Sequence, residues 1–566
     1  MELKKNDIVP VHIDGAASGG EGVAHVDGQA VFVKGALPGE ECLAHILRSQ
    51  RGVVWAKADS VTAASAHRIA PECPVFPRCG GCALLHADYE EELRIKRERV
   101  NDAFARIGGL DLRVDSVTGS DERFGYRNKA VFAVGRAGGR AVTGFYRARS
   151  HDILPVERCL LQTDAANAAA AVLREWMDAT GAPEYDEQTH KGCMRRLMAR
   201  TASDGSTAVC LVCAREPRGL DGLVEALRRG VPGLVSVTLD LNSSHGNAVL
   251  SGDQRLLWGA PRLTDTVLGL RFSLSPMSFF QINRRQAERL YSRAIEYASL
   301  DGCAHLLDLY CGTGTIGLCA ARYVGRVTGA EVVPEAVEDA RENARANGIE
   351  NASFITGDAA EAARRLADAG ERPDVIIVDP PRAGLEAGVI AEIVRMAPER
   401  VVYVSCDPAT LARDLRVFAP DYTAVAASAF DMFPATSHVE SVVKLVRERR
   451  HSMDLAPRPF SMIKNGKKTI ELRLFDEKRQ KIKVGDSIVF TETATGEKLS
   501  VKVEKLHRFD SFEELYRSLP LLECGYTEET VADARPSDME GFYSPEKQKK
   551  YGVVGIEISL PDGDTD

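Results

Sequence analysis

Cys406 is placed where a thiol could act as a nucleophile at the mouth of an α/β sheet. The residues before it, VVYV (401–404), favour a strand, and Asp407, Pro408 and Ala409 are typical of the start of a helix. A helix N-terminus stabilises a thiolate, so this position predicts a thiol pKa below its usual value of about 8.5. A nucleophilic cysteine also needs something to attack, which the neighbouring segments have to supply.

A glycine-rich turn between a predicted strand and a predicted helix indicates a nucleotide-like ligand. Gly312, Gly314 and Gly317 have the G-x-G-x-x-G spacing that lets a backbone approach a ligand closely, although this match alone is weak. Asp308 would repel a pyrophosphate but suits an α-ammonium group, and Glu331, which ends the next strand, can accept hydrogen bonds from ribose hydroxyls. Together the two carboxylates favour S-adenosylmethionine over a nicotinamide cofactor.

Strands and helices alternate over residues 261–447, which is typical of a doubly wound parallel sheet. The third strand closes on Asp358, and the fourth ends in DPPR (379–382), next to where a methyl group should emerge. Enzymes that methylate exocyclic amines of bases use a similar acidic or amide residue followed by two prolines, so that reaction is an alternative. It has no use, however, for a thiol on the fifth strand.

A thiol beside a methyl donor suits methylation of a uracil ring at carbon 5. Addition of a thiolate to carbon 6 turns the ring into an enolate, whose carbon 5 can then displace the methyl group. A base must afterwards remove the proton from carbon 5, so that the thiol is expelled. Glu440 is the candidate base, with His438 as the weaker alternative.

Five motifs together resemble the motif series of the RNA uracil-5-methyltransferases. They are SFFQIN (278–283), DLYCGTGTIGL (308–318), DPPRAGL (379–385), YVSCDPATLARDL (403–415) and FPATSHVE (433–440). The resemblance extends from residue 1 to about 447 and implies that Cys406 is the nucleophile and Glu440 the proton acceptor. Cys311 is expected to be structural. The resemblance also implies six cofactor contacts: Gln281, Tyr310, Thr315, Glu331, Asp358 and Asp379.

Three cysteines lie close together in PECPVFPRCGGCALLH (71–86), with the spacing C-x5-C-x2-C. The set Cys73, Cys79 and Cys82 suits either zinc or an iron–sulfur cluster, and the spacing does not identify a fourth ligand. The family resemblance implies a 4Fe-4S cluster with Cys159 as that ligand. Cys210 and Cys213 are an alternative pair, but alternation puts them on opposite faces of a strand, so we interpret them as core. We expect a structural or RNA-positioning cluster.

Two segments precede the cofactor sheet. Residues 1–60 alternate apolar and polar residues between glycine-rich turns, which predicts a small antiparallel β-barrel, and GGEGVAHVDGQAVFVKGALPGE (19–40) resembles the OB-like, RNA-binding TRAM domain. Residues 61–260 are expected to form a cysteine-cluster and central RNA-binding domain. Within it, RFGYRNK (123–129) and CMRRLMAR (193–200) are basic and partly aromatic, and could contact single-stranded RNA.

RNA is the expected substrate, because a stacked base must be turned out before both faces of its ring can be reached. The resemblance makes large-subunit ribosomal RNA the first choice, since the cysteine cluster accompanies the ribosomal enzymes more than the transfer-RNA one. A transfer-RNA uracil-5-methyltransferase is the alternative.

Residues 453–566 are expected to be an independently encoded, β-rich module. Gly466, Lys468, Glu471 and Arg473 match the G-x-K-x-x-E-x-R signature of the ASCH domain, a PUA-like barrel that this segment resembles. Relatives that hydrolyse acetylated cytidine carry threonine where Glu471 stands, so we expect an RNA- or nucleotide-contacting accessory module. The charged, proline-containing stretch RERRHSMDLAPRPF (447–460) is interpreted as a linker.

The bulk composition is that of an ordinary multidomain protein. A chain of 566 residues is too long for one hydrophobic core, and a net charge of −9 argues against non-specific adhesion to nucleic acid. No signal-peptide pattern and no apolar run of membrane-spanning length is found. We therefore expect a cytoplasmic, monomeric enzyme of multidomain α/β architecture that does not interact with membranes.

Overall fold

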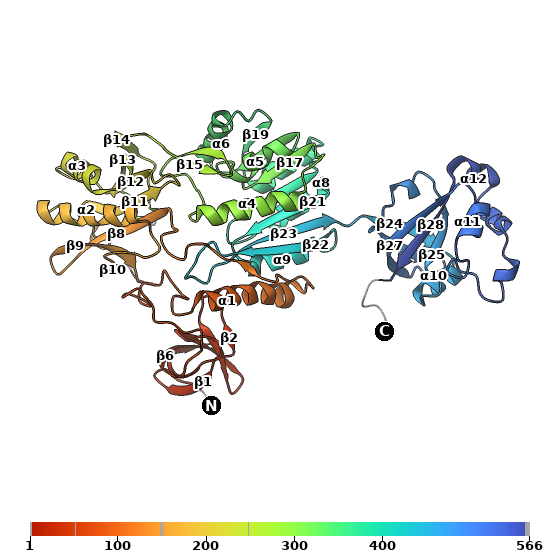
Figure 1. Cartoon of the computed structure of the whole chain (residues 1–566), viewed down its shortest axis with the longest axis horizontal. Coiled ribbons are helices and arrows are strands. Elements are labelled where there is room, and N and C mark those ends of the chain that lie inside the picture. Colours follow the sequence, from red (N-terminus) through yellow and green to blue (C-terminus); the bar gives the residue numbers. More distant parts are fainter. Residues whose placement is uncertain (1–2, 51, 148–149, 151, 247, 561–566) are drawn as a thin grey trace. The chain divides into compact units, whose positions relative to one another are not determined.

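The chain divides into two compact units, Met1–Val446 and Arg447–Asp566, which are described separately (Figure 1). The computed structural model describes residues 3–50, 52–147, 150, 152–246 and 248–560. Among these residues, no helix is both long enough and apolar enough to cross a lipid bilayer.

The expected N-terminal barrel is present as a half-barrel. Its strands are β1 (Ile8–His12), β2 (Gly15–Ala16), β3 (Gly22–Val26), β4 (Gln29–Lys34), β5 (Glu41–Gln50) and β6 (Val53–Ala63). They lie in the order β1-β5-β6-β4-β3-β2. Although β1 and β2 follow each other in the chain, β1 pairs with β5 and β2 pairs with β3. The bend between them therefore curls the sheet around a single core.

The segment after the half-barrel does not form one separate domain. Its loop carries Cys73, Cys79 and Cys82 and leads into α1 (Tyr89–Asp102) and the π-helix η1 (Ala103–Gly108). Both helices pack beside α9 (Pro408–Phe418). The short strand β7 (Val117–Thr118) pairs with β22 (Tyr422–Phe430). This part of the chain therefore completes the cofactor sheet that follows it.

A second sheet forms the central domain. Its strands are β8 (Lys129–Ala137), β9 (Arg140–Tyr146), β10 (Ile153–Pro155), β11 (Met194–Thr201), β12 (Thr207–Cys213), β13 (Leu234–Leu241) and β14 (Gln254–Gly259). They lie in the order β10-β9-β8-β11-β12-β13-β14. The helices α2 (Asp164–Thr180) and α3 (Leu220–Gly230) contribute to the same hydrophobic core.

The expectation that CMRRLMAR provides an RNA-facing surface is wrong for two of its arginines. Arg195 is 3% exposed and donates hydrogen bonds to the carbonyl oxygens of Asn242 and Ser244. Arg200 is 5% exposed and donates to the carbonyl oxygen of Ser278. These charges hold loops together inside the protein.

Cys210 and Cys213 are buried in separate hydrophobic clusters, as their alternation along β12 predicts.

The third sheet has the doubly wound form that the sequence predicts. After the hairpin β15 (Leu263–Val267) and β16 (Leu270–Leu274) come β17 (His305–Leu309), β18 (Arg326–Glu331), β19 (Ala352–Thr356), β20 (Val375–Val378), β21 (Arg400–Ser405), β22 and β23 (Glu440–Arg447). The sheet order is β19-β18-β17-β20-β21-β23-β22-β7. Strands β17 to β21 are parallel, and β23 runs antiparallel to β21.

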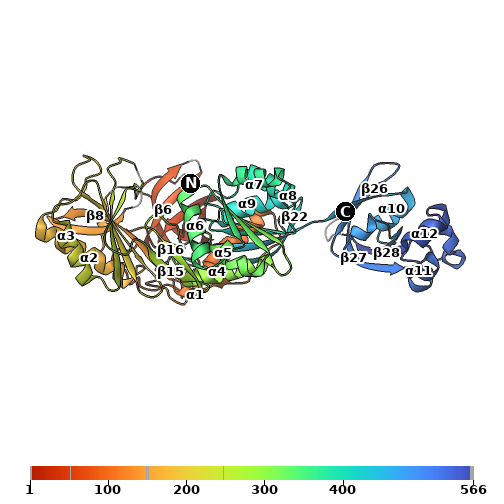
Figure 2. The same ribbon diagram turned by 90° about the horizontal axis from the view of Figure 1, so that it is seen from above.

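Helices cover both faces of this sheet (Figure 2). One face carries α4 (Arg284–Ala298), α5 (Thr315–Ala320), η2 (Ala321–Tyr323) and α6 (Pro334–Ala346). The other carries α1, η1, α7 (Ala359–Asp368), α8 (Ala387–Met396) and α9. Because the strand order reverses between β17 and β20, their carboxyl ends flank a crevice, which is where open α/β sheets bind ligands.

The tail unit is a curled five-stranded sheet of order β24-β26-β27-β28-β25. Its strands are β24 (Arg450–Leu455), β25 (Ile470–Leu474), β26 (Ser487–Glu492), β27 (Lys498–Phe509) and β28 (Val553–Ser559). Its helices are α10 (Pro457–Lys464), α11 (Phe512–Ser518) and α12 (Pro545–Tyr551), with shorter turns η3 (Arg479–Lys481), η4 (Val531–Asp533) and η5 (Pro536–Gly541).

The interpretation of residues 447–460 as a linker is wrong. Part of this stretch is β24, which pairs in parallel with β26. Met453 and Leu455 alternate with polar neighbours and are buried in the core of the tail unit. This two-residue period is a strand signal that the many charges obscure.

Candidate active site

A single large cavity collects every side chain that the sequence assigned to catalysis or cofactor binding. It has a volume of about 1570 Å³ and is lined by the residues that follow β17, β18, β20 and β21. Both predicted catalytic residues, Cys406 and Glu440, line it. The six predicted cofactor residues also line it: Gln281, Tyr310, Thr315, Glu331, Asp358 and Asp379.

The glycine-rich turn after β17 brings Asp308 against the backbone of α5. A β-carbon at Gly317 would lie 2.8 Å from Oδ2 of Asp308, so only glycine fits there. The Gly317 amide instead donates a hydrogen bond of 2.9 Å to this oxygen. Oδ1 of Asp308 is buried without a hydrogen-bond partner in the part of the chain that the structure describes. A buried, unpaired carboxylate oxygen at a cavity is suited to a ligand cation such as an α-ammonium group.

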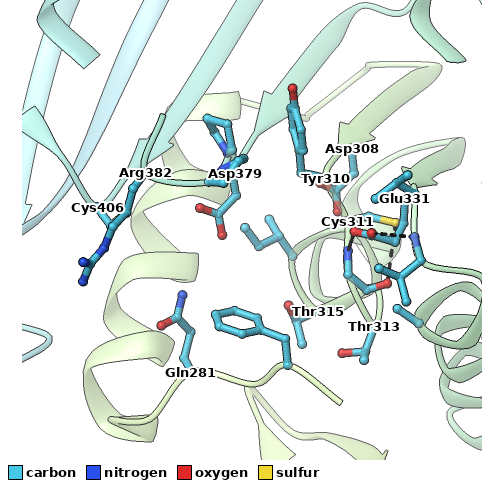
Figure 3. A pocket seen from close by; sticks show the side chains of 18 of the residues that line it. Gln281, Asp308, Tyr310, Cys311, Thr313, Thr315, Glu331, Asp379, Arg382 and Cys406 are labelled. Atoms are coloured by element: carbon cyan, nitrogen blue, oxygen red, sulfur yellow. Dashed lines mark hydrogen bonds between the residues drawn. The ribbon is translucent and has the colours of Figure 1, made fainter. Parts of the chain in front are cut away.

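Glu331 is fixed at the end of β18 by two backbone hydrogen bonds (Figure 3). Its Oε2 accepts from the Gly312 amide at 3.1 Å, and its Oε1 accepts from the Val333 amide at 2.9 Å. Each carboxylate oxygen can accept more than one hydrogen bond. The side chain is therefore held in place and can still accept hydrogen bonds from the hydroxyls of a ribose.

Asp358 and Thr315 have local contacts of their own beside the cavity. Asp358 caps α7, because its Oδ1 accepts hydrogen bonds from the amides of Ala360 (2.9 Å) and Glu361 (3.4 Å). Thr315 is the first residue of α5, and its hydroxyl lies 3.5 Å from the hydroxyl of Tyr291. Both side chains are thereby anchored at helix starts that face the cavity.

Asp379 and Gln281 point into the cavity from opposite sides (Figure 3). Asp379 follows β20 and carries the first position of DPPR. Gln281 is 8% exposed, and the Asn128 side chain holds its backbone carbonyl through a hydrogen bond of 2.9 Å. A planar heterocycle between them would meet an amide on one side and a carboxyl on the other.

Three buried acids with raised pKa values lie in the cavity. Burial raises the pKa of Asp308 and of Asp379 to about 7 and that of Glu440 to about 8. The charge of Asp379 adds to the shift at both Asp308 and Glu440. A cationic ligand bound among these groups would stabilise their ionised forms.

The expected lowering of the Cys406 pKa is wrong. Burial, followed by the charges of Glu440 and Asp379, raises the pKa of this thiol to about 11. The helix N-terminus does not offset these effects, because Oδ1 of Asp407 accepts from the amides of Ala409 (2.9 Å) and Thr410 (3.1 Å). The first turn of α9 therefore stabilises Asp407 instead of the sulfur.

His438 is a poor proton acceptor in this setting. Burial and the charges of Arg382 and Arg99 lower its pKa to about 4, and its Nε2 lies 3.5 Å from a guanidinium nitrogen of Arg382. Glu440 is 3% exposed and, with a pKa of about 8, is the stronger base of the two. These pKa shifts therefore favour Glu440, the first of the two predicted bases.

Two arginines near the thiol were missed as site residues. Arg382 lines the cavity, and its charge lowers the pKa of Cys406. Arg99, on α1, donates a hydrogen bond of 2.7 Å to the carbonyl oxygen of Ser437 and lies 3.5 Å from Oδ2 of Asp407. The DPPR motif offered a signal for Arg382. No local pattern could have placed Arg99 here.

The four predicted cluster ligands lie around a second cavity of about 270 Å³: Cys73, Cys79, Cys82 and Cys159. Arg127 also lines this cavity, and its charge opposes the rise that burial causes in the pKa of Cys82. Within the described residues, no group of three or more histidine, cysteine or acidic side chains could hold one metal ion. The structure therefore brings the four thiols to one cavity, and the metal that they would hold stays a prediction.

Three segments of the chain match known families. Residues 266–448 match the family described as tRNA (Uracil-5-)-methyltransferase, residues 2–58 match the TRAM domain, and residues 453–562 match the ASCH domain. An uncharacterized RNA methyltransferase of Clostridium tetani is 38% identical over 446 residues, which cover 78% of this chain and 97% of that protein. Another, from Caldanaerobacter subterraneus subsp. tengcongensis, is 40% identical over 449 residues, which cover 79% of this chain and 99% of that protein.

A solved structure has the same fold over most of the chain. The Pyrococcus abyssi tRNA (uracil-54, C5)-methyltransferase in complex with S-adenosyl-L-homocysteine superposes with a TM-score of 0.63 and 26% identity. The superposition covers 77% of this chain and all of that one. Fold and site together thus define an S-adenosylmethionine-dependent methyltransferase. Within that class, the chain belongs to the RNA (uracil-5-)-methyltransferase family. The alternative of exocyclic-amine methylation is therefore discarded.

Proposed function

We propose that this enzyme methylates carbon 5 of a uridine in large-subunit ribosomal RNA, with Cys406 as nucleophile and Glu440 as base. The observation that carries the proposal is that both side chains line the same cavity as the six cofactor residues. One cavity can therefore hold the uracil ring, the nucleophile, the base and the methyl donor. The roles of the six cofactor residues are part of the same proposal.

Once the thiol proton has passed to solvent, the sulfur of Cys406 forms a bond to carbon 6 of the uracil, and the displaced electron pair makes the ring an enolate. Bound S-adenosylmethionine would supply an electrophilic methyl group: as carbon 5 bonds to the methyl carbon, the bond from that carbon to the sulfonium sulfur would break and S-adenosylhomocysteine would be left. Glu440 then removes the hydrogen from carbon 5 as a proton. The carbon 5–carbon 6 double bond re-forms, and the Cys406 sulfur leaves. Arg382 assists the first step, because its charge favours the thiolate.

Glu440→Gln tests the roles proposed for Cys406 as nucleophile and Glu440 as base. The amide cannot accept the proton, so addition and methyl transfer should proceed and release should stop. Denaturing gels should show a protein–RNA adduct on ordinary uridine RNA, and mass spectrometry should find a methylated uridine on Cys406. Cys406→Ala should form no adduct. An adduct that persists in Cys406→Ala, or fast turnover by Glu440→Gln, would refute these roles.

The choice of ribosomal RNA as substrate rests on the predicted cysteine cluster, and transfer RNA is the second candidate. The solved relative from Pyrococcus abyssi is named as a tRNA (uracil-54, C5)-methyltransferase, which favours that candidate. Mapping of 5-methyluridine in ribosomal and transfer RNA, from cells with and without this chain, separates the two. Loss of a methyluridine from large-subunit ribosomal RNA supports the first, and loss from transfer RNA alone refutes it.

We further propose that Cys73, Cys79, Cys82 and Cys159 hold a 4Fe-4S cluster. The support is that four thiols surround one cavity, with Arg127 available to balance the negative charge of the ligated cluster. Anaerobically purified protein should contain about four iron and four sulfide per chain, and a Cys79→Ala variant should contain far less. Stoichiometric zinc without iron would overturn this assignment.

The tail is proposed to contact RNA or a nucleotide. Glu471 forms ion pairs with Lys468 (3.2 Å) and Arg473 (2.9 Å), and all three side chains are largely buried. A lysine engaged in this way is poorly placed for a hydrolytic role of its own. Incubation of the whole chain with acetylcytidine should therefore give no deacetylation, and rapid release of acetate would contradict the proposal.

A further inference from the structure

We propose that Ala435 is a positioning residue through which the cysteine-bearing loop holds the proton acceptor in place. The inference rests on the roles proposed for Cys406 and Glu440. It concerns the segment from Asp431 to Glu440, here called the base loop, which joins β22 to β23. The base loop ends at Glu440 and also carries His438, so its conformation fixes where the base meets the substrate.

Ala435 is in a backbone conformation that alanine rarely adopts. Its φ angle is 67°, in the left-handed region, and its side chain is fully buried. A non-glycine residue in this region is strained and persists only where the surroundings over-determine it. Such strain at a functional loop indicates that neighbouring contacts hold the loop in place.

The hydrogen bonds that hold the Ala435 backbone come from the cysteine-bearing loop and from α1, which follows it in the chain. The amides of Ala83 and Leu84 both donate to the carbonyl oxygen of Ala435, each at 3.0 Å. Ala83 directly follows the cluster ligand Cys82 in the chain. On the other side of the residue, the Ala435 amide donates to Oε1 of Glu92 at 2.7 Å. Both backbone groups of the strained residue are therefore bonded to elements outside the base loop.

Packing reinforces the same link. Ala435, Leu85, Tyr126 and Leu161 form one buried hydrophobic cluster. Three of the predicted cluster ligands pack against its edge: Cys73, Cys82 and Cys159. The Tyr126 hydroxyl also donates a hydrogen bond of 3.0 Å to the carbonyl oxygen of Pro434. A shift of the cysteine loop would therefore be transmitted directly to the middle of the base loop.

Helix α1, which carries Glu92, also fixes both ends of the base loop. Lys96 is fully buried and lies 2.6 Å from Oδ1 of Asp431. The Tyr89 hydroxyl donates to Oδ2 of the same residue at 2.8 Å. Near the other end, Arg99 holds the carbonyl oxygen of Ser437. The cysteine loop and Glu92 therefore hold the middle of the base loop, while other residues of α1 hold its two ends.

This arrangement predicts which chemical step depends on the cysteine loop. The base loop carries the proton acceptor, whereas the nucleophile Cys406 follows β21 on a different segment. Displacement of the base loop should therefore slow proton removal from carbon 5 more than formation of the thiol adduct. A misplacement of about 1 Å can cost a large factor in rate.

The Tyr126→Phe variant tests how the base loop is held, because it removes only the hydroxyl that donates to the carbonyl oxygen of Pro434. The matched control is Tyr422→Phe, because the buried Tyr422 hydroxyl likewise donates to a proline carbonyl, that of Pro398, at 3.0 Å. Each variant is mixed with S-adenosylmethionine and protein-free large-subunit ribosomal RNA from cells that lack the enzyme. Adduct formation and release of methylated RNA are timed separately by quenching in denaturant. Transfer RNA from the same cells serves as a second substrate.

We expect Tyr126→Phe to slow release by about fivefold with little change in adduct formation, and Tyr422→Phe to change neither rate. Cys79→Ala should slow release further and lengthen the lifetime of the adduct on ordinary uridine. Equal slowing of both steps, or no change in release for Tyr126→Phe, would overturn the proposal. Failure of the proposed roles themselves would look different, since wild-type protein would then form no adduct at Cys406.

Discussion

At the residue scale, the cavity is built to bind a cation. Asp308 and Asp379 are buried acids whose pKa values lie near 7, and the pKa of Glu440 lies near 8. S-adenosylmethionine carries positive charge on its sulfonium and α-ammonium groups, so its binding should favour the ionised acids. The positive charge of the bound cofactor would therefore balance the negative charge of these acids.

Cofactor affinity should depend on pH with a definite sign. Below about pH 7 the free protein holds protons on Asp308 and Asp379, and these must be released when the cation binds. Affinity should fall about tenfold per acid between pH 8 and pH 6 and level off at higher pH. Titration calorimetry in buffers of different ionisation enthalpy should detect the released protons.

The neutral thioether product is the control for that measurement. S-adenosylhomocysteine lacks the sulfonium charge, so its affinity should vary less with pH than that of S-adenosylmethionine. Asp379→Asn should also flatten the pH dependence, because the amide has no proton to release. Equal pH profiles for both ligands would show that these acids do not respond to the sulfonium.

At the element scale, the sequence predicted those strands and turns that leave a local pattern of apolar and turn residues. Apolar runs and turn residues identified the strands that contain Asp308 and Glu331 and the strands that end just before Asp379 and Cys406. All four side chains line the cavity. Contacts between segments far apart in the sequence form a second group, which could not be predicted because they leave no local pattern. The position of α1 against α9, and with it Arg99, belongs to this group.

Two errors concern charged groups whose three-dimensional surroundings the sequence pattern did not show. The thiol pKa was misjudged because Asp407 accepts from the first amides of α9, which depends on side-chain geometry. Arg195 and Arg200 looked like surface charges, but both are buried and hold distant loops. Sequence pattern identifies an arginine cluster without showing what faces it.

Gly317→Ala tests the contact between α5 and β17. Its β-carbon would lie 2.8 Å from Oδ2 of Asp308, so the carboxylate must move and its bond to the Gly317 amide is lost. Affinity for S-adenosylhomocysteine should fall at least about tenfold, equivalent to about 1.4 kcal/mol. Calorimetry measures this directly.

Gly388→Ala is the matched control in α8. A β-carbon there meets only the Ala360 side chain at 3.9 Å, which is an ordinary contact. Helical alanine is favoured over glycine by about 0.5–1 kcal/mol, so Tm should stay the same or rise slightly. Ligand affinity should be unchanged. If both variants lose affinity equally, the close approach at Gly317 is not what shapes the site.

At the scale of the whole molecule, the chain combines a complete enzyme with an added unit. The matched relatives are covered at 97% and 99% by alignments of 446 and 449 residues, so they are shorter than this chain. The second compact unit begins at Arg447 and has its own hydrophobic core. Methyl transfer should therefore not require the tail.

Removal of residues 449–566 tests this independence. The remaining chain should fold and form the Cys406 adduct at the rate of the full chain, because every residue of the large cavity precedes the cut. RNA affinity, measured by filter binding at fixed salt, should weaken if the tail contacts RNA as proposed. A truncated chain that folds but no longer methylates would show that the two units act together.

Trapping with RNA that carries 5-fluorouridine at the target position is the most direct test of the covalent mechanism. After methyl transfer, carbon 5 bears fluorine in place of the hydrogen that Glu440 would remove, so the thiol cannot be expelled. We predict a stable cross-link that requires S-adenosylmethionine, maps to Cys406 by mass spectrometry and is absent from Cys406→Ala. Methylation of ordinary RNA by a chain that never forms this cross-link would contradict the account.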